Sequence, residues 1–317
     1  MASSVSVVLA ALFANGAIAV LKFGGYLLTG SPAMLSETYH SISDTGNQVF
    51  LLVGIFYGRK EASREHPFGY GKAQFFYSFL VSVLLFGIAG WESLKHGYDA
   101  IVNPHPVSAG TVTLPVVGAT IPNVWVNYTV LIAAITFEAY ALKKANDSLT
   151  KQIRENDWSG YREAFKKTAD VTVLTAFTED AIAMGGAGLA LFGVFLSRVT
   201  GNPLFDAVSA FLIGVMLMGF AAALAWENKR LLLGESLPDS DERELRAIVE
   251  GAPGVVDVVD FRTVYFGPQK ILVTADVAFD PELETEEIDD SITDLEDQIK
   301  AAEKDVSKVY IEPEVEE

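Results

Sequence analysis

The sequence predicts an α-helical membrane protein, with six transmembrane helices followed by a small α+β domain. Half of the 317 residues are hydrophobic, a high share for a soluble chain. Six stretches are long enough to cross a bilayer, which takes about 20 mostly apolar residues. Charge is uneven: of 41 acids and 23 bases, 25 acids and 7 bases lie from Glu235 onward, so 16 of each precede it. A neutral, apolar part is therefore followed by a strongly acidic one.

The apolar stretches and the loops between them predict a topology. The stretches cover residues 4–28, 33–58, 74–98, 122–143, 171–196 and 203–226. The loops after the second, fourth and sixth stretches carry lysines and arginines, whereas "TGSPA" and residues 101–121 carry none. Basic residues collect on the cytoplasmic side of a membrane. We therefore expect a multi-pass protein of the cell membrane with both termini in the cytoplasm.

The acidic part predicts a separate cytoplasmic domain in the order helix, strand, strand, helix, strand. "SDERELRAIVEGA" starts with a Ser-Asp cap and ends at a Gly-Ala-Pro-Gly break. Two β-branched runs flank "GPQ", and "ETEEIDDSITDLEDQIKAAEK" places apolar residues at helical spacing before the strand "SKVYIEPE". This order gives a small sheet with helices on one face. We divide the chain into a transmembrane domain (1–230) and a ferredoxin-like cytoplasmic domain (231–317).

Composition excludes several kinds of chemistry. The chain has no cysteine, so disulfides, thiolate metal sites and cysteine nucleophiles are excluded, and oxygen and imidazole nitrogen must hold any metal. The acidic surface of the tail argues against nucleic acid as a partner.

Polar residues form a stripe in the second stretch, "LSETYHSISDTGNQ". Glu37, His40, Asp44 and Asn47 fall on one face of a helix with 3.6 residues per turn. A charged group at bilayer depth costs at least ~2.5–3.5 kcal/mol, so the stripe requires partners or water. Two interpretations follow, namely a packing stripe with satisfied hydrogen bonds, or a site for metal ions or protons.

The fifth stretch offers a counterpart in "TAFTEDAIAMGG". Glu179 and Asp180 would lie at about the depth of the stripe if the two helices run in opposite directions. One histidine with two or three carboxylates suits a borderline divalent cation such as Zn²⁺ or Mn²⁺. A further acid, Glu138, sits in the fourth stretch, where a salt bridge to Lys143 is the alternative to a functional role.

These motifs resemble a known family. "ANGAIAVLKFGGYLLTGSPAMLSETYHSISDTGNQ", "EHPFGYGKAQFF", "GNPLFDAVSAFLIGVML" and "LLLGES" occur in order along nearly the whole chain. In this combination the chain resembles the cation diffusion facilitators, which are zinc-transporter-type exchangers. "HSISD" followed by "HPFGYGK" is the most specific signal. "TFEAYAL", "TED" and "GNPLFDA" most resemble the branch that contains the mitochondrial zinc transporter.

The resemblance implies a transport site made of two residues four apart on each of two helices. On the second helix the pair corresponds to His40 and Asp44. On the fifth helix the second position corresponds to Asp180, but the first falls on Ala176, which cannot bind a metal. Glu179 is then the expected substitute.

Other donors could complete the site where that substitute does not reach. A water molecule, Asn47 or Glu37 could take the remaining position, and Glu37 and Glu138 could relay protons. The departure from the family pattern leaves room for Mn²⁺, Fe²⁺, Co²⁺ or Ni²⁺ beside Zn²⁺.

A second metal site of the family is incomplete here. His66 matches one ligand, but Tyr70 and Ser63 stand where a histidine and an aspartate would be expected. His66 is therefore a weak candidate, and a loop that shapes the entry to the third helix is the alternative. His96 and His105 are weaker still. The family's cytoplasmic domain dimerises, so the resemblance also implies a homodimer.

Together these observations predict a transporter and not an enzyme. We expect a Zn²⁺/H⁺ antiporter that exports metal from the cytoplasm by alternating access, with the divalent cation as substrate and no prosthetic group. Metal ligands must lose their protons to bind, so one site can exchange the two kinds of ion. The rival from another class is an intramembrane metalloenzyme, but the chain lacks an HExxH pair. A channel is the other alternative.

Overall fold

The computed structural model describes residues 2–104, 110–113, 120–155, 158–167, 171–268 and 270–314. The chain forms two compact units. The first comprises Met1–Leu52 and Leu80–Ala225, and the second comprises Val53–Phe79 and Trp226–Glu317. The acidic tail thus shares its unit with the ends of the helices that lead to it and with the loop that contains His66.

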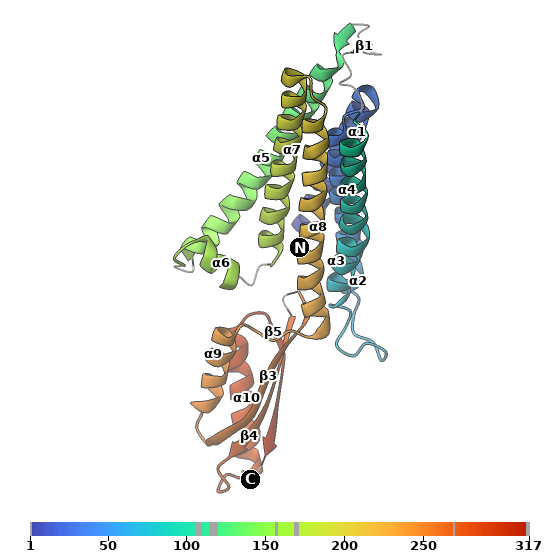
Figure 1. Cartoon of the computed structure of the whole chain (residues 1–317). Helices are drawn as coiled ribbons and strands as arrows, with labels where there is room; N and C mark the ends of the chain where they lie inside the picture. The colour runs from blue at the N-terminus through green and yellow to red at the C-terminus, as the bar shows by residue number, and fades with distance from the viewer. Residues whose placement is uncertain are drawn as a thin grey trace. The chain divides into compact units, whose positions relative to one another are not determined.

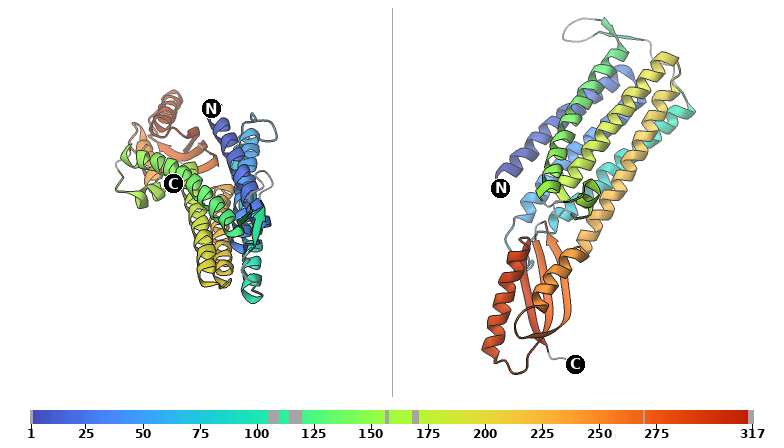
Figure 2. Two further views of the ribbon diagram at one scale, coloured as in Figure 1. Left: turned by 90° about the horizontal axis from the view of Figure 1, so that it is seen from above. Right: turned by 90° about the vertical axis from the view of Figure 1, so that its left-hand side faces the viewer.

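Long helices make up the first unit, and α2, α3 and α8 extend across the boundary into the second (Figures 1 and 2). They are α1 (Ala2–Thr29), α2 (Pro32–Gly58), α3 (Ala73–Val81), α4 (Gly87–Val102), α5 (Asn123–Glu155), α7 (Val171–Thr200) and α8 (Leu204–Leu233). A π-helical turn, Ser82–Phe86, joins α3 to α4, and α6 is the short helix Tyr161–Lys167. The strands β1 (Thr111–Thr113) and β2 (Thr120–Pro122) form a small antiparallel ribbon. Gly30 and Gly201 end α1 and α7 with φ of 67° and 70°, a left-handed conformation that favours glycine.

Five described helical segments are long and apolar enough to cross a membrane. They are Ala11–Thr29, Ala73–Val102, Asn123–Glu155, Ala176–Thr200 and Leu204–Leu233. The remaining expected span, α2, has 27 residues but carries the polar stripe. Its first half is largely buried, including Ala33, Met34, Glu37 and His40. A helix surrounded by other helices need not be apolar on every face, which explains the low hydropathy of α2.

Small residues bring α4 and α8 into backbone contact. A Cβ atom on Gly214 would lie 2.5 Å from the backbone nitrogen of Leu94, and one on Gly97 would lie 2.4 Å from that of Phe211. The hydroxyls of Ser36 and Ser93 both donate to the carbonyl of Ala210 on α8, at 3.4 and 3.3 Å. Close approach through small residues is the usual way in which helices pack inside a membrane.

Asp206, in the first turn of α8, holds the start of α2. Its Oδ1 accepts hydrogen bonds from the Ser31 hydroxyl at 3.0 Å and from the Ala33 backbone N–H at 3.2 Å. A carboxylate is favourable at a helix N-terminus because the first N–H groups have no partner within the helix. The start of α2 is therefore fixed to α8.

The second unit contains the predicted domain. Its elements are α9 (Asp239–Glu250), β3 (Val255–Gly267), β4 (Lys270–Phe279), α10 (Thr285–Ala302) and β5 (Val306–Glu314). The strand order is β3-β4-β5, with β3 and β4 antiparallel and β4 and β5 parallel. Leu245 and Val249 of α9 and Leu295 and Ile299 of α10 share one core with alternate β4 residues such as Val273. Both helices therefore cover one face of the sheet, and the predicted fold class is confirmed.

The loop between α2 and α3 belongs to the same unit. Gly69 has a φ of 80°, as a glycine-rich turn requires. A Cβ atom on Gly71 would lie 2.6 Å from the carbonyl oxygen of Phe266, so the loop contacts the end of β3 closely. Lys72 Nζ donates to the carbonyl oxygen of Leu232 at 3.4 Å, near the C-terminus of α8. A cation is favourable at that end of a helix.

We expect Gly214→Leu to destabilise the helical bundle and Gly219→Leu to be tolerated. Both positions are interior to α8, but a Cβ on Gly219 meets nothing within 4 Å. Overpacking costs about 1–3 kcal/mol, and more where backbone must move. The thermal unfolding midpoint of the purified protein in detergent should fall for the first variant alone. Equal midpoints for the two variants would contradict the backbone contact between α4 and α8.

Candidate metal centre

The polar stripe of α2 is buried. Glu37, His40 and Asp44 are 0%, 1% and 4% exposed, and they follow one another along one face of the helix. His40 Nε2 lies 3.5 Å from Asp44 Oδ2. This distance is longer than a normal hydrogen bond, so the two groups are close neighbours without a direct hydrogen bond between them.

Several nitrogen and oxygen atoms in and beside this stripe, all of types that can bind a metal ion, have no hydrogen-bond partner within the described part of the chain. They are both ring nitrogens of His40, Oδ1 of Asp44, Oε1 of Glu37 and the hydroxyl of Ser41. A buried polar group without a partner costs about 1–3 kcal/mol. Imidazole nitrogen and carboxylate oxygen are ligands for borderline divalent cations, so the donor set fits such a cation as substrate.

Glu179 lies against this stripe from α7. Asn47 Nδ2 donates to both carboxylate oxygens of Glu179, each at 3.2 Å. The carboxyl groups of Glu179 and Asp44 lie within electrostatic range of each other. Glu179 therefore joins α7 to the polar stripe of α2 through Asn47.

Asp180 follows Glu179 on α7. The charges that act on Asp44 come from Glu179, Glu138, Lys22 and Glu37, and Asp180 is not among them. Instead, the charge of Asp180 acts on Glu138 of α5, the helix that packs beside α7. Adjacent residues on a helix are about 100° apart around its axis, yet both acids lie within electrostatic range of Glu138.

Glu138 faces the interior of the bundle. It is 6% exposed, and the charges of Lys22, Asp180 and Glu37 act on it. Within the described ranges no ion pair joins it to Lys143. The structure therefore does not provide the salt bridge that was its alternative interpretation.

No three side chains of histidine, aspartate or glutamate form a ready metal cage among the residues that the structure describes. The geometry is instead a His40–Asp44 pair on α2 beside an Asn47–Glu179 pair that joins α2 to α7. Ala176, at the first family position on α7, contributes only a methyl group.

Lys22 is a polar partner that sequence reasoning missed. Its Nζ lies 2.7 Å from Glu37 Oε2, and both side chains are 0% exposed. The signal was present in "AVLKFGG", because a lysine inside an apolar span is as costly as an acid. Only the pairing with α2 required the structure.

His66 lies in an exposed loop among aromatic and hydroxyl groups. Its ring stacks on Tyr70 with centroids 4.2 Å apart, and its backbone N–H donates to the Ser63 hydroxyl. His96 is 44% exposed and stacks against Tyr39. His105 lies outside the described residues. Among the described residues, neither His66 nor His96 belongs to a cluster of histidine, aspartate and glutamate side chains that could hold a metal ion.

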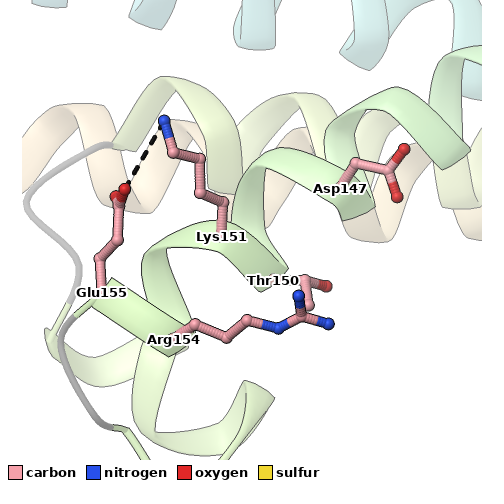
Figure 3. A pocket seen from close by; sticks show the side chains of 5 residues that line it. All are labelled: Asp147, Thr150, Lys151, Arg154 and Glu155. Carbon is pink, nitrogen blue, oxygen red and sulfur yellow. Dashed lines mark ion pairs between the residues drawn. The ribbon is translucent and has the colours of Figure 1, made fainter.

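The extension of α5 beyond its apolar part carries a separate surface hollow of about 410 Å³ (Figure 3). Asp147, Thr150, Lys151, Arg154 and Glu155 line it. Lys151 and Glu155 form an ion pair of 3.6 Å, drawn as a dashed line. None of these residues belongs to the polar stripe, so the hollow is not part of the candidate metal centre.

Comparison with known families defines the class. Residues 8–233 match the family described as cation efflux transmembrane domain, and residues 237–316 match the cation efflux protein cytoplasmic domain. The chain belongs to the cation efflux family and is a membrane protein. The predicted family is confirmed, and so is the expected class, a transporter family and not an enzyme family.

Individual relatives come from several kingdoms. The chain is 28% identical over 274 residues to the human "Proton-coupled zinc antiporter SLC30A9, mitochondrial", an alignment that covers 86% of this chain and 46% of that protein. It is 24% identical over 273 residues to "Metal tolerance protein C4" of Arabidopsis thaliana, with 86% and 56% covered. "Cation-efflux pump FieF" of Klebsiella pneumoniae is 24% identical over 264 residues, with 83% and 77% covered.

The length of the match differs between these relatives. The chain spans about half the length of the mitochondrial and plant proteins that it matches. The expected branch, which contains the mitochondrial zinc transporter, is confirmed by these matches.

We expect Glu179→Gln to weaken metal binding more than Asp180→Asn, because Glu179 adjoins the His40–Asp44 pair. Loss of a ligand should raise the Kd for Zn²⁺ at least about tenfold, or ~1.4 kcal/mol. Isothermal titration of the purified protein in detergent measures both variants.

Asp147→Asn is the matched control, because it makes the same chemical change at an exposed position of α5. A larger effect of Asp180→Asn than of Glu179→Gln would assign the ligand to Asp180, as the family pattern implies.

Proposed function

We propose that the protein exchanges a divalent cation, Zn²⁺ in the first place, for protons across the membrane. The observation that carries this proposal is the buried His40–Asp44 pair of α2, both of whose side chains have atoms without a hydrogen-bond partner in the described chain, beside the Glu179 carboxylate of α7 that Asn47 holds. The family match supports it, as does the similarity to a relative named as a proton-coupled zinc antiporter.

In this proposal, three residues hold the cation. His40 contributes a ring nitrogen, and Asp44 and Glu179 contribute carboxylate oxygens, while Asn47 keeps Glu179 oriented. Ala176 offers no donor, so the fourth position of a tetrahedral shell is left to water or to Asp180. A site with mixed nitrogen and oxygen ligands also accepts Mn²⁺, Fe²⁺, Co²⁺ or Ni²⁺, which makes the choice of metal a matter of geometry and supply.

The same groups account for proton exchange. A neutral imidazole and ionised carboxylates bind metal, whereas their protonated forms do not. Protons that arrive from one side therefore displace the cation, and the cation that arrives from the other side displaces protons. Glu138 is placed to relay protons, because it is buried and the charges of both Glu37 and Asp180 act on it.

The remaining features concern the setting of the transporter. The distribution of basic loops supports cytoplasmic termini and export from the cytoplasm across the cell membrane. We keep the division into residues 1–230 and 231–317 as part of the proposal, supported by the family matches to residues 8–233 and 237–316. The second match is to the cytoplasmic domain of the family, and we propose that this domain joins two copies into a homodimer. Divalent cations, protons and lipid are the partners, and no nucleic acid is required.

We expect protein reconstituted in liposomes to carry Zn²⁺ at a rate that depends on a pH gradient. Asp44→Asn should reduce the initial rate at least about tenfold, since it removes a ligand that also exchanges protons. Asp180→Ala should have a smaller effect, and Asp147→Asn should leave the rate unchanged. Mn²⁺ is measured in parallel to establish the preference between metals.

Three results would oppose the proposal. Zn²⁺ flux that ignores the pH gradient would favour a channel. Flux that is indifferent to Asp44 would show that the cation crosses elsewhere. Absence of flux for every cation, with intact folding, would overturn the transport function itself.

A further inference from the structure

The Lys22–Glu37 pair lies next to the proposed metal centre without being part of its ligand set. Lys22 comes from α1, whereas Glu37 lies on α2 about one turn before His40. Lys22 is the only fully buried lysine or arginine among the residues whose burial the structure describes. Its ammonium group is therefore a resident cation within the helix bundle.

Structural stability alone does not explain this pair. Removing two charges from water is costly, and well-packed apolar residues of similar size usually stabilise a fold as well or better. A membrane interior raises that cost further. The Lys22 ammonium and the Glu37 carboxylate therefore require an explanation in terms of their electrostatic effect on the neighbouring metal ligands.

Glu37 reaches across to α7 through its second oxygen. A Cβ atom on Gly186 would lie 2.6 Å from Glu37 Oε1, so the carboxylate lies against the backbone of α7 at this glycine. Oε1 has no hydrogen-bond partner within the described residues, whereas Oε2 is held by Lys22. One oxygen of the Glu37 carboxylate thus accepts a hydrogen bond from Lys22. The other has no partner within the described residues, lies beside α7, which carries Glu179, and is of a type that can bind a metal ion.

The charge of Lys22 extends over the whole polar group. Besides Glu37, it acts on His40, Asp44 and Glu138. A positive charge within range of several carboxylates weakens the attraction that those carboxylates exert on a second cation. The Lys22 ammonium and a transported cation are therefore attracted by the same carboxylates.

We propose that Lys22 is a tethered cation that competes with the transported metal for the carboxylates of the site. It holds Glu37 away from the metal and limits the affinity of the site, so that the bound cation can be released. Lys22 touches no transported ion and acts through Glu37, as a positioning residue. This inference rests on the proposed function, because it assumes that His40, Asp44 and Glu179 bind the cation.

The test measures Zn²⁺ affinity and transport separately in the full-length protein. In Lys22→Met, Glu37 becomes available as an additional ligand. The Kd for Zn²⁺ should fall at least about tenfold, and the maximal flux in liposomes should fall as well, because release is slowed. Lys22→Arg keeps the cation and should restore both values to within about threefold of the wild type.

Two further variants separate competition from simple support of the fold. Lys22→Met combined with Glu37→Gln removes the additional ligand, so the gain in affinity should disappear. Glu37→Gln alone releases the ammonium toward Asp44 and should raise the Kd at least about tenfold. Thermal midpoints in detergent are recorded for each variant, and Glu37→Gln provides the test if Lys22→Met does not fold.

A merely structural pair gives a different pattern. Affinity and maximal flux would then fall together in Lys22→Met, in step with the thermal midpoint, and Glu37→Gln would leave the Kd of the folded protein unchanged. Either result overturns the role of Lys22. Because Kd is measured without transport, a wild type that binds Zn²⁺ but carries none would refute the proposed function and still allow the competition to be judged.

Discussion

Polar and charged side chains inside a membrane need partners, and α2 is built around this constraint. Each neighbouring helix supplies something to it: α1 supplies the ammonium of Lys22, α7 supplies the Glu179 carboxylate that Asn47 binds, and α8 supplies Asp206 at its first turn. In a low dielectric these contacts are worth far more than on a surface. The polar helix α2 is therefore held by side chains from three other helices.

Glycine serves two purposes in this bundle. Gly214 lets the backbones of α4 and α8 touch, which gives a rigid frame without large side chains. Gly186 instead makes room for a polar side chain, the carboxylate of Glu37. A site that depends on donor atoms from two helices must keep them within a fraction of an ångström, and rigid helix contacts achieve this better than loops.

The sequence was sufficient for the elements but not for every contact between them. Hydrophobic residues recur with a different period in helices and in strands, so the long helices and the αββαβ order could be predicted. The glycines Gly30, Gly201 and Gly254 mark turns between elements. The His40–Asp44 pair could be predicted too, because the geometry of a single helix places residues four apart on one face. Whether Glu179 or Asp180 faces α2 depends on the rotation of α7, which packing decides and periodicity does not.

Two departures of this site from a closed metal cage have the same consequence. Ala176 leaves one position without a protein ligand, and Lys22 opposes the charge of any cation that enters. Sites that retain a metal permanently surround it with four protein ligands, whereas sites that must exchange a ligand keep a position open. A carrier has to release its substrate at every cycle, so a site with fewer ligands and an internal counter-charge suits transport better than storage. In the mechanism that we propose, the lysine of α1 and the missing ligand on α7 both lower the affinity of the site and so favour release of the cation.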